Sequence, residues 1–335
     1  MIDYKKLRLL SQVPSTTLFE APLLTYLKHY FRFKNYDQIL GNGYIVFKPK
    51  NETNGILLTI HIDRLGLVCC SDNKIRYSNY FGYESYGKQY SPAFDFGKRF
   101  LDQSVQAYDP VSGKILGRGK VTGVNIEDSS DLIFTVDDLK LGNHSLPLPI
   151  SYQREVEMRN NHIIGQIDNV ISIYLAYELL ERELGYTFLF STQEEIGMSW
   201  RQMHDFLSRN YVNEIIVLDT APVEGLASIN EVDLVFRLSD DMADYTEEFV
   251  NKLVALAKQH NLRHYLITKH PPNDNAKGIT ELGRLITHGN LRIKGATIQF
   301  PTMNYHTIQE TTTVDSFESI LFFLTCLSNS QNFSV

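Results

Sequence analysis

The segment Ile56–Asp63 reads ILLTIHID, and its pattern decides the class of fold. Residues Ile56–Ile60 form a mainly apolar run of strand length, which is typical of a strand covered on both faces in the middle of a sheet. Two polar residues, His61 and Asp63, follow at its end. Strands of this kind occur in parallel sheets that carry helices on both sides, so the segment predicts an α/β fold.

Similar apolar runs alternate with amphipathic segments along the rest of the chain. The runs predict strands over Gly43–Lys48, Tyr186–Ser191, Glu214–Leu218, His264–Thr268 and Ala296–Phe300. The amphipathic segments predict helices over Thr16–Phe31, Asp168–Leu184, Ser199–Leu207, Tyr245–Gln259, Ile279–His288 and Val314–Ser328. In the first of these, Ser15 and Thr16 are candidate caps that Glu20 follows. This alternation predicts a three-layer α/β/α sandwich.

Residues 67–157 differ in texture from the segments on either side. They are rich in tyrosine, glycine, serine and aspartate, and the alternating segments Ile115–Val124 and Leu132–Val136 predict short strands between turns. A chain of 335 residues also exceeds the usual size of one hydrophobic core. We therefore expect a discontinuous α/β domain over residues 1–66 and 158–335, with a small β-rich, barrel-like domain inserted over residues 67–157.

The composition is that of an ordinary globular protein with a net charge of −7. With this acidic balance, no basic excess favours binding to nucleic acid or to an anionic membrane, and we expect neither as a partner. No run of about 18 apolar residues predicts a membrane span, and the N-terminus lacks a signal-peptide pattern. The cysteines, Cys69, Cys70 and Cys326, do not form a disulfide framework, so we expect the reducing cytoplasm. Cys69 and Cys70 are interpreted as buried strand thiols rather than metal ligands.

Acidic residues and histidines follow the ends of the predicted strands or precede a helix, and ligands bind at this edge of open α/β sheets. The candidate residues are His61, Asp63, Asp168, Glu194, Glu195, Asp219 and His306. Carboxylates mixed with imidazoles suit Zn²⁺, Mn²⁺ or Co²⁺. Crowded carboxylates would repel one another unless cations neutralised them, and a carboxylate is able to bridge two ions. The set predicts a divalent-metal site, although each residue alone also fits a cap, a turn or a surface position.

Five motifs, in order along the chain, resemble those of the tetrahedral or deblocking aminopeptidases, metallopeptidase family 42. They are His61–Gly66 (HIDRLG), Gly165–Asn169 (GQIDN), Ser191–Gly197 (STQEEIG), Leu218–Asp219 (LD) and Pro301–Thr307 (PTMNYHT). The β-rich insertion also lies where that family has its dimerisation domain. The resemblance implies a zinc-peptidase-like sandwich in which residues 1–66 and 158–335 form the catalytic domain.

The resemblance also implies a cofactor of two divalent metal ions, zinc or alternatively cobalt or manganese. Asp168 would bridge the two ions. His61 and Asp219 would complete the ligands of one ion, and Glu195 and His306 those of the other.

Two further roles follow from the resemblance. Glu194 would act as general base, taking a proton from the metal-activated water that attacks the scissile carbonyl. Asp63 would accept the other ring N–H of His61 and so fix the imidazole tautomer. The implied protein is a cytoplasmic aminopeptidase that removes N-terminal residues from peptides. It would form a homo-oligomer based on dimers, which in this family is often a hollow dodecamer.

Three positions depart from the family pattern. Arg64 stands where the family has glutamate, Val170 where it has arginine, and Glu281 where it has the aspartate of a Thr-Asp-Ala segment. The expected ligands are unaffected, so these departures bear on substrate choice and assembly. Arg64 is interpreted either as a partner of an acidic group on the substrate or as one side of a surface salt bridge.

Two alternatives to an aminopeptidase stay open. An N-acyl amino acid deacylase or another amide hydrolase uses the same chemistry, and a panel of aminoacyl anilides and N-acetyl amino acids separates these activities. A non-catalytic binding or scaffold protein is the second alternative. It predicts purified protein that lacks two bound metals and hydrolyses nothing after Zn²⁺, Co²⁺ or Mn²⁺ is added.

Overall fold

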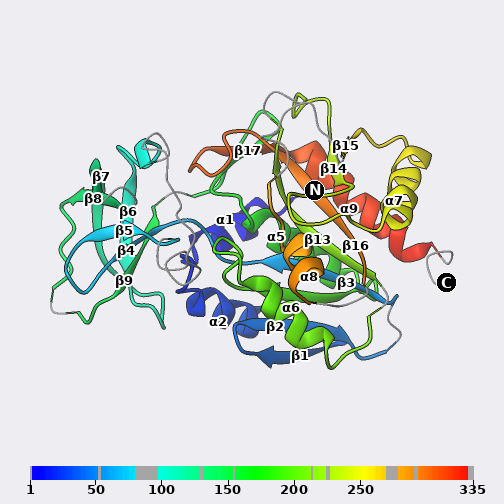
Figure 1. Ribbon diagram of the computed structural model, residues 1–335, viewed down its shortest axis with the longest axis horizontal. Coiled ribbons are helices and arrows are strands. Elements are labelled where there is room, and N and C mark those ends of the chain that lie inside the picture. The colour runs from blue at the N-terminus through cyan, green and yellow to red at the C-terminus, as the bar shows by residue number, and fades with distance from the viewer. Residues whose placement is uncertain are drawn as a thin grey trace.

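The computed structural model describes residues 2–51, 54–79, 97–127, 131–142, 144–153, 155–212, 214–223, 227–268, 278–289 and 293–330. Figure 1 shows a large α/β body with a smaller β-barrel at one side. The barrel strands come from a continuous stretch of the chain, and the α/β body is built from the segments before and after it.

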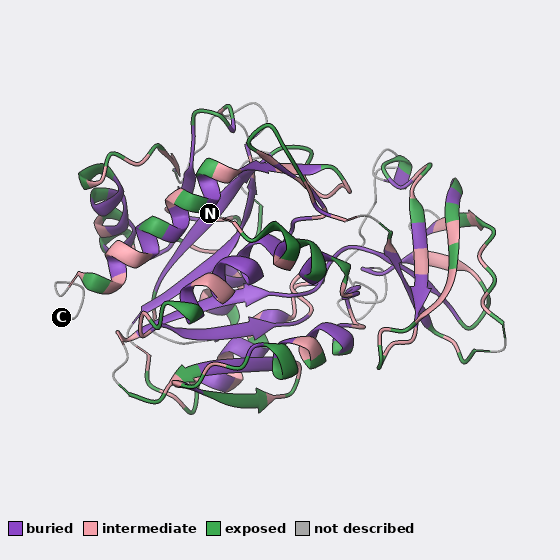
Figure 2. Ribbon diagram, turned by 180° about the vertical axis from the view of Figure 1, so that it is seen from behind, coloured by how far each residue is buried: buried purple, intermediate pink, exposed green. Residues whose placement is uncertain are grey.

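Within the described residues, an eight-stranded sheet forms the centre of the large body. Its strands, in spatial order, are β1 (Tyr36–Gly41), β2 (Tyr44–Pro49), β12 (Thr187–Ser191), β3 (Ile56–His61), β13 (Glu214–Pro222), β16 (Lys294–Thr302), β14 (Leu234–Arg237) and β15 (His264–Ile267). The central strands β12, β3, β13 and β16 run parallel. Every residue of β3 is buried, as its apolar sequence predicts, whereas β1 at the edge is mostly exposed (Figure 2).

Helices cover both faces of this sheet. On one face, α6 (Ser199–Leu207) packs against α8 (Glu281–Gly289), and both lie in front of the sheet in Figure 1. The other face carries α1 (Tyr4–Gln12), α5 (Val170–Glu181), α9 (Val314–Asn329) and α7 (Glu247–Gln259), each in contact with the next, and α2 (Ala21–Tyr30) packs on β2. The α/β/α sandwich is therefore confirmed.

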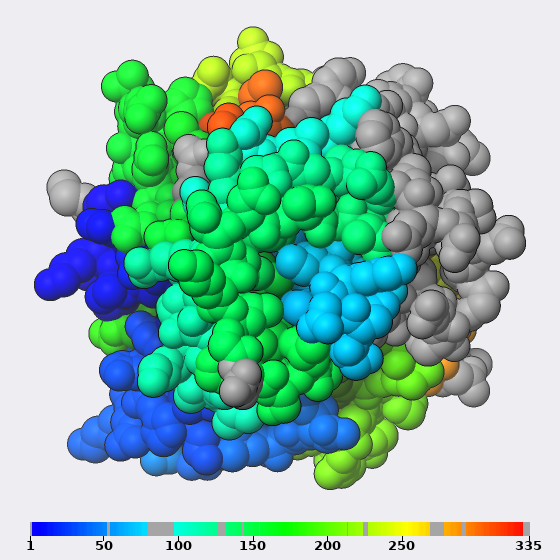
Figure 3. Space-filling model, turned by 90° about the vertical axis from the view of Figure 1, so that its left-hand side faces the viewer, coloured from blue at the N-terminus to red at the C-terminus, as the bar shows by residue number. Residues whose placement is uncertain are grey.

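The inserted β-rich part closes into a barrel. Its strands, in order around the barrel, are β4 (Leu67–Cys69), β5 (Ile75–Tyr77), β8 (Asp131–Asp137), β7 (Ile115–Glu127), β6 (Ser104–Tyr108) and β9 (Leu148–Tyr152). They enclose a hydrophobic core of their own, centred on Phe100 and Phe134. Figure 3 views the molecule from the barrel end, with the N-terminal residues in blue beside it. Cys69 and Cys70 are buried there as thiols rather than in a disulfide.

A small antiparallel sheet, separate from the central one, positions two loops. It contains β10 (Glu157–Arg159), β11 (His162–Gly165) and β17 (Glu310–Thr313). Gly165 at the end of β11 pairs with Glu310 at the start of β17. The start of the loop after β11 therefore lies beside the end of the loop before β17.

Most predicted elements occur, with shifted ends, but the start of the first predicted helix is wrong. Helix α2 begins at Ala21 rather than Thr16, because Thr16 forms a bridge with Arg64 and Leu18 has a positive φ of 77°. Glu20 does not complete a capping box: its side chain accepts the amide N–H of Leu18 instead. Among the described residues, no helix is long and apolar enough to cross a membrane.

Candidate metal centre

Three neighbouring strands of the central sheet bring candidate ligands to one edge. Strand β3 ends at His61, and its parallel neighbour β12 ends at Ser191, the residue paired with His61. The turn that contains Glu194 and Glu195 therefore begins beside this histidine. On the other side of β3, the longer strand β13 carries Asp219. This is the carboxyl edge, where ligands of open α/β sheets bind.

Asp168 and His306 reach the same edge from the two loops that the small sheet holds together. Asp168 lies between β11 and α5, two residues before the helix begins. His306 lies between β16 and β17, and the ring of Tyr305 stacks on it with centroids 3.9 Å apart. Residues far apart in the sequence are thus neighbours in the structure.

Asp168 lies between the two histidines. Its Oδ1 is 3.1 Å from Nε2 of His61, and its Oδ2 is 3.6 Å from Nε2 of His306. Asp219 Oδ1 is 3.3 Å from the same His61 nitrogen, and Glu195 Oε2 is 3.8 Å from the same His306 nitrogen. The five side chains therefore form a His61–Asp219 half and a Glu195–His306 half that share Asp168.

The cluster is buried and strongly acidic. His61, Asp168 and Glu195 are 2%, 3% and 8% exposed. Burial lowers the pKa of His61, but its contacts with Asp168, Asp219 and Asp63 outweigh burial and raise that pKa well above its usual value. Burial, together with the charge of Asp168, raises the pKa of Glu195. The field of the cluster therefore favours a cation at its centre.

Divalent metal ions fit this donor set. Ligand atoms of His61, Asp168 and Glu195 all lie within 4.8 Å of one another. Glu195 Oε1 is buried and has no hydrogen-bond partner in the described part of the chain. A buried oxygen without a partner is costly, and a metal ion would satisfy it. Carboxylate and imidazole donors suit Zn²⁺, Mn²⁺ and Co²⁺.

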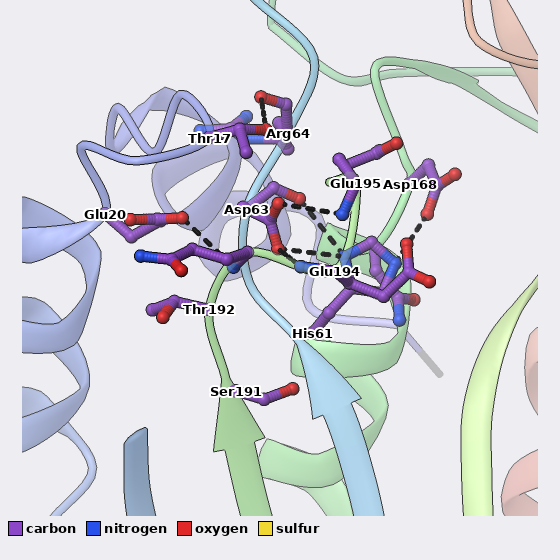
Figure 4. Close-up of polar contacts among 12 residues, drawn as sticks. Thr17, Glu20, His61, Asp63, Arg64, Asp168, Ser191, Thr192, Glu194 and Glu195 are labelled. Atoms are coloured by element: carbon purple, nitrogen blue, oxygen red, sulfur yellow. Dashed lines mark hydrogen bonds and ion pairs between the residues drawn. The ribbon is translucent and has the colours of Figure 1, made fainter. Parts of the chain in front are cut away.

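Asp63 anchors the turn that carries the two glutamates. Its Oδ1 accepts the amide N–H of Glu194 at 2.9 Å, and its Oδ2 accepts that of Glu195 at 3.1 Å (Figure 4). Nδ1 of His61 lies 3.2 Å from the main-chain oxygen of Asp63 and 3.6 Å from its Oδ1. The main-chain oxygen, rather than the expected carboxylate, is therefore the nearer partner of the His61 ring.

Glu194 has a partner outside the ligand cluster. Its Oε1 accepts a hydrogen bond from Nη1 of Arg284 at 2.8 Å, and the two side chains are 13% and 16% exposed. Burial raises the pKa of Glu194 to about 7, and the charge of Arg284 opposes this shift. A carboxylate that titrates near neutral pH is suited to carry a proton.

Two buried carboxylates that the sequence interpretation did not assign to the site hold the ligand loops. Glu310 is 1% exposed and accepts the amide N–H groups of Asp168 and His306, each at 2.9 Å. Glu20 is 4% exposed, and its Oε1 accepts the amide N–H of Gln193 at 3.1 Å. Neither follows a predicted strand, so the pattern that located the ligands gives no signal for them.

The inserted part of the chain also contacts the ligand loops. Asn79, just after β5, donates from Nδ2 to the main-chain oxygen of Glu195 at 3.0 Å. Arg99, just before β6, donates from Nη1 to the main-chain oxygen of Tyr305 at 3.1 Å. The barrel therefore supports the site.

Arg64 does not have either of its expected environments. It is 6% exposed and donates to the main-chain oxygens of Ser11 and Val13 and to the hydroxyl of Ser15. Within the described residues, no carboxylate pairs with it. The side chain is buried against the segment after α1, so both the substrate-partner and the surface salt-bridge interpretations are wrong.

The other two residues that depart from the family pattern, Val170 and Glu281, are also buried. Val170 is the first residue of α5 and lies fully in the core. Glu281 is 1% exposed and accepts the hydroxyl of Ser191, the last residue of β12. Glu281 therefore contacts the strand that leads to Glu194, whereas Val170 serves packing.

A sandwich with this donor set at its carboxyl edge, and a barrel inserted after the first histidine, defines the class of zinc-peptidase-like folds. The chain belongs to the M42 glutamyl aminopeptidase family, whose sequence profile matches residues 147–321, just over half of its length. The resemblance found in the sequence motifs is thereby confirmed. Among curated proteins, none matches the chain significantly.

Solved structures of three archaeal peptidases are similar over nearly the whole chain. The TET aminopeptidase of a Thaumarchaeota archaeon from marine sediment has a TM-score of 0.76 at 15% identity, covering 99% of this chain and 98% of that chain. An aminopeptidase of Desulfurococcus kamchatkensis has a TM-score of 0.73 at 14% identity, with coverage of 98% and 94%. The TET1 peptidase of Pyrococcus horikoshii has a TM-score of 0.71 at 17% identity, with coverage of 97% and 98%. At these identities the likeness shows the fold.

Proposed function

We propose that this metal-dependent aminopeptidase holds two divalent ions, zinc or alternatively cobalt or manganese, and cleaves N-terminal residues from peptides. The observation that carries the proposal is the position of Asp168, whose two oxygens face the two histidines. A carboxylate in this position is able to bridge two ions. His61 and Asp219 would complete the ligands of one ion, and Glu195 and His306 those of the other.

When bound, the ions lower the pKa of a water molecule and polarise the scissile carbonyl. Glu194 takes a proton at a carboxylate oxygen and returns it to the leaving amine, a role that its raised pKa supports. Asp63 fixes the main chain of the turn, so Glu194 and Glu195 keep their different directions. The acidic surroundings attract the positively charged amino end of a peptide.

We propose further that the protein is a cytoplasmic homo-oligomer built from dimers through the inserted barrel. The TET1 peptidase of P. horikoshii assembles into a tetrahedron or a large octahedral shell, and its fold is shared over nearly the whole length of both chains. A dodecamer is the assembly we expect, and light scattering after gel filtration measures its mass.

The test combines metal content with activity on aminoacyl anilides and N-acetyl amino acids. We expect about two ions per chain and hydrolysis of the anilides. Glu194→Gln should keep its metal and lose turnover by at least about 100-fold, the low end for a lost general base. Glu248→Gln, at an exposed position on α7, is the matched control and should keep full activity.

Two outcomes would contradict the proposal. Hydrolysis of N-acetyl amino acids without hydrolysis of anilides would make the protein a deacylase. Near-normal turnover by Glu194→Gln would remove this residue from the mechanism.

A further inference from the structure

One nitrogen of Arg284, Nη1, contacts two oxygen atoms of Glu194. This nitrogen lies 2.8 Å from Oε1 of the carboxylate and 3.3 Å from the main-chain oxygen of the same residue. The contact uses one carboxylate oxygen only, although a guanidinium commonly binds both. In the described part of the chain, Oε2 of Glu194 receives no hydrogen bond.

The guanidinium is held in place by the turn itself. A Cβ atom on Gly197 would lie 2.7 Å from Nε and 2.8 Å from Cζ of Arg284, so the glycine leaves the space that the guanidinium fills. Gly197 also has a φ of 73°, a conformation that favours glycine. Its amide N–H donates to the main-chain oxygen of Glu194, which Arg284 also contacts. Arg284, Gly197 and Glu194 therefore form one compact unit.

We propose that Arg284 is a positioning residue for Glu194. It fixes Oε1 and leaves Oε2 to exchange the proton. This inference rests on the proposed function, because it takes Glu194 as the general base. The main chain of the turn is anchored separately, by Asp63, so loss of Arg284 releases the carboxylate of Glu194 but leaves Glu195 in place. A displaced base lowers the rate of the chemical step without weakening substrate binding.

Kinetics of Arg284→Ala and Arg284→Lys on a neutral aminoacyl anilide test this role. For Arg284→Ala we expect kcat to fall by about 10- to 100-fold, with KM within about threefold and with unchanged metal content. The kcat of Arg284→Lys should fall less, because the lysine ammonium group still reaches toward Oε1 of Glu194 with a single donor. Guanidinium ion added at millimolar concentration should restore part of the kcat of Arg284→Ala and none of that of Arg284→Lys. Arg182→Met, at an exposed position after α5, removes the same charge and should change nothing.

A second measurement does not depend on activity. Melting temperatures of Arg284→Met, Glu194→Gln and the double variant test the contact directly. Because the pair is mostly buried, we expect the two side chains to be coupled. The melting temperature of the double variant should therefore fall by less than the sum of the decreases in the two single variants.

Each way of failing gives a different result. Additive losses of melting temperature would show that the contact is absent, which overturns the inference whether or not the protein is a peptidase. A rise of KM with unchanged kcat would assign Arg284 to substrate binding, and loss of metal would assign it to the ligand turn. Either result overturns the inference, whereas an inactive wild-type enzyme with coupled melting temperatures would overturn the proposed function alone.

Discussion

Carboxylates of the same chemical type have different tasks around this centre, and their contacts decide which task each one has. Asp168 turns both oxygens to histidines, whereas Asp63 turns both to main-chain N–H groups. The sequence located both because they follow a strand or precede a helix, where an α/β sheet places its ligands. It did not locate Glu310, whose importance depends on a pairing between β11 and β17 that no local pattern encodes.

Glu310 should be required for both stability and metal affinity. Glu310→Ala leaves the buried N–H of Asp168 and the partly buried N–H of His306 without an acceptor, at a cost of about 1–3 kcal/mol for the buried group and less for the other. Because these N–H groups position two ligands, we also expect metal affinity to fall about 10- to 100-fold. Denaturant unfolding and metal titration measure the two effects.

Gln309→Ala is the matched control for this prediction, because Gln309 is exposed and adjacent. Its free energy of unfolding and its metal affinity should equal those of the wild type within experimental error. An unchanged metal affinity in Glu310→Ala would mean that the two loops hold their ligands without this carboxylate.

At the scale of elements, the sequence predicted the central strands and most helices because their apolar patterns are long and regular. It missed β14 and β17, which have only four residues each, and β1, which is mostly exposed. It also placed the start of α2 too early, because the periodicity of leucines does not register the positive φ of Leu18. Strands β14 and β17 pair with segments distant in the sequence, and local patterns do not encode such contacts. Strand β1 pairs only with the adjacent β2, and its exposed position at the sheet edge leaves it without an apolar run.

The entry to α2 should give the fold a measurable pH dependence through Glu20. Burial and the charge of Asp63 raise the pKa of Glu20 to about 8, from a usual 4.5. The folded state therefore holds this proton more tightly than the unfolded state. The resulting stabilisation is complete below pH 4.5 and is lost as the pH rises toward 8. The side chain of Glu20→Gln does not titrate. The melting temperature of this variant should therefore rise relative to that of the wild type between pH 5 and pH 9.

Glu247→Gln, at an exposed position on α7, provides the comparison. Its melting temperature should keep a constant difference from that of the wild type over the same range. If Glu20→Gln behaved in the same way, Glu20 would not carry a raised pKa in the folded protein.

At the scale of the whole molecule, acidic residues from distant parts of the chain meet at one edge of the sheet. The net charge of −7 counts all of them as ionised. In the fold, Asp168, Glu194 and Glu195 share a buried site with His61, where repulsion opposes folding unless cations enter. We therefore expect the stability of this fold to depend on bound cations more than the composition alone indicates.

Metal binding should for this reason stabilise the entire chain. Protein treated with a chelator should melt at a lower temperature, and added Zn²⁺, Co²⁺ or Mn²⁺ should raise the melting temperature by about 5 °C or more, the gain expected at about 100 times the dissociation constant. Asp168→Asn removes the carboxylate between the two histidines and should abolish most of this rise, whereas Glu248→Gln on the surface should keep it. A full rise in Asp168→Asn would show that the ions bind elsewhere, because a ligand stabilises a fold only through the site that it occupies in the native state.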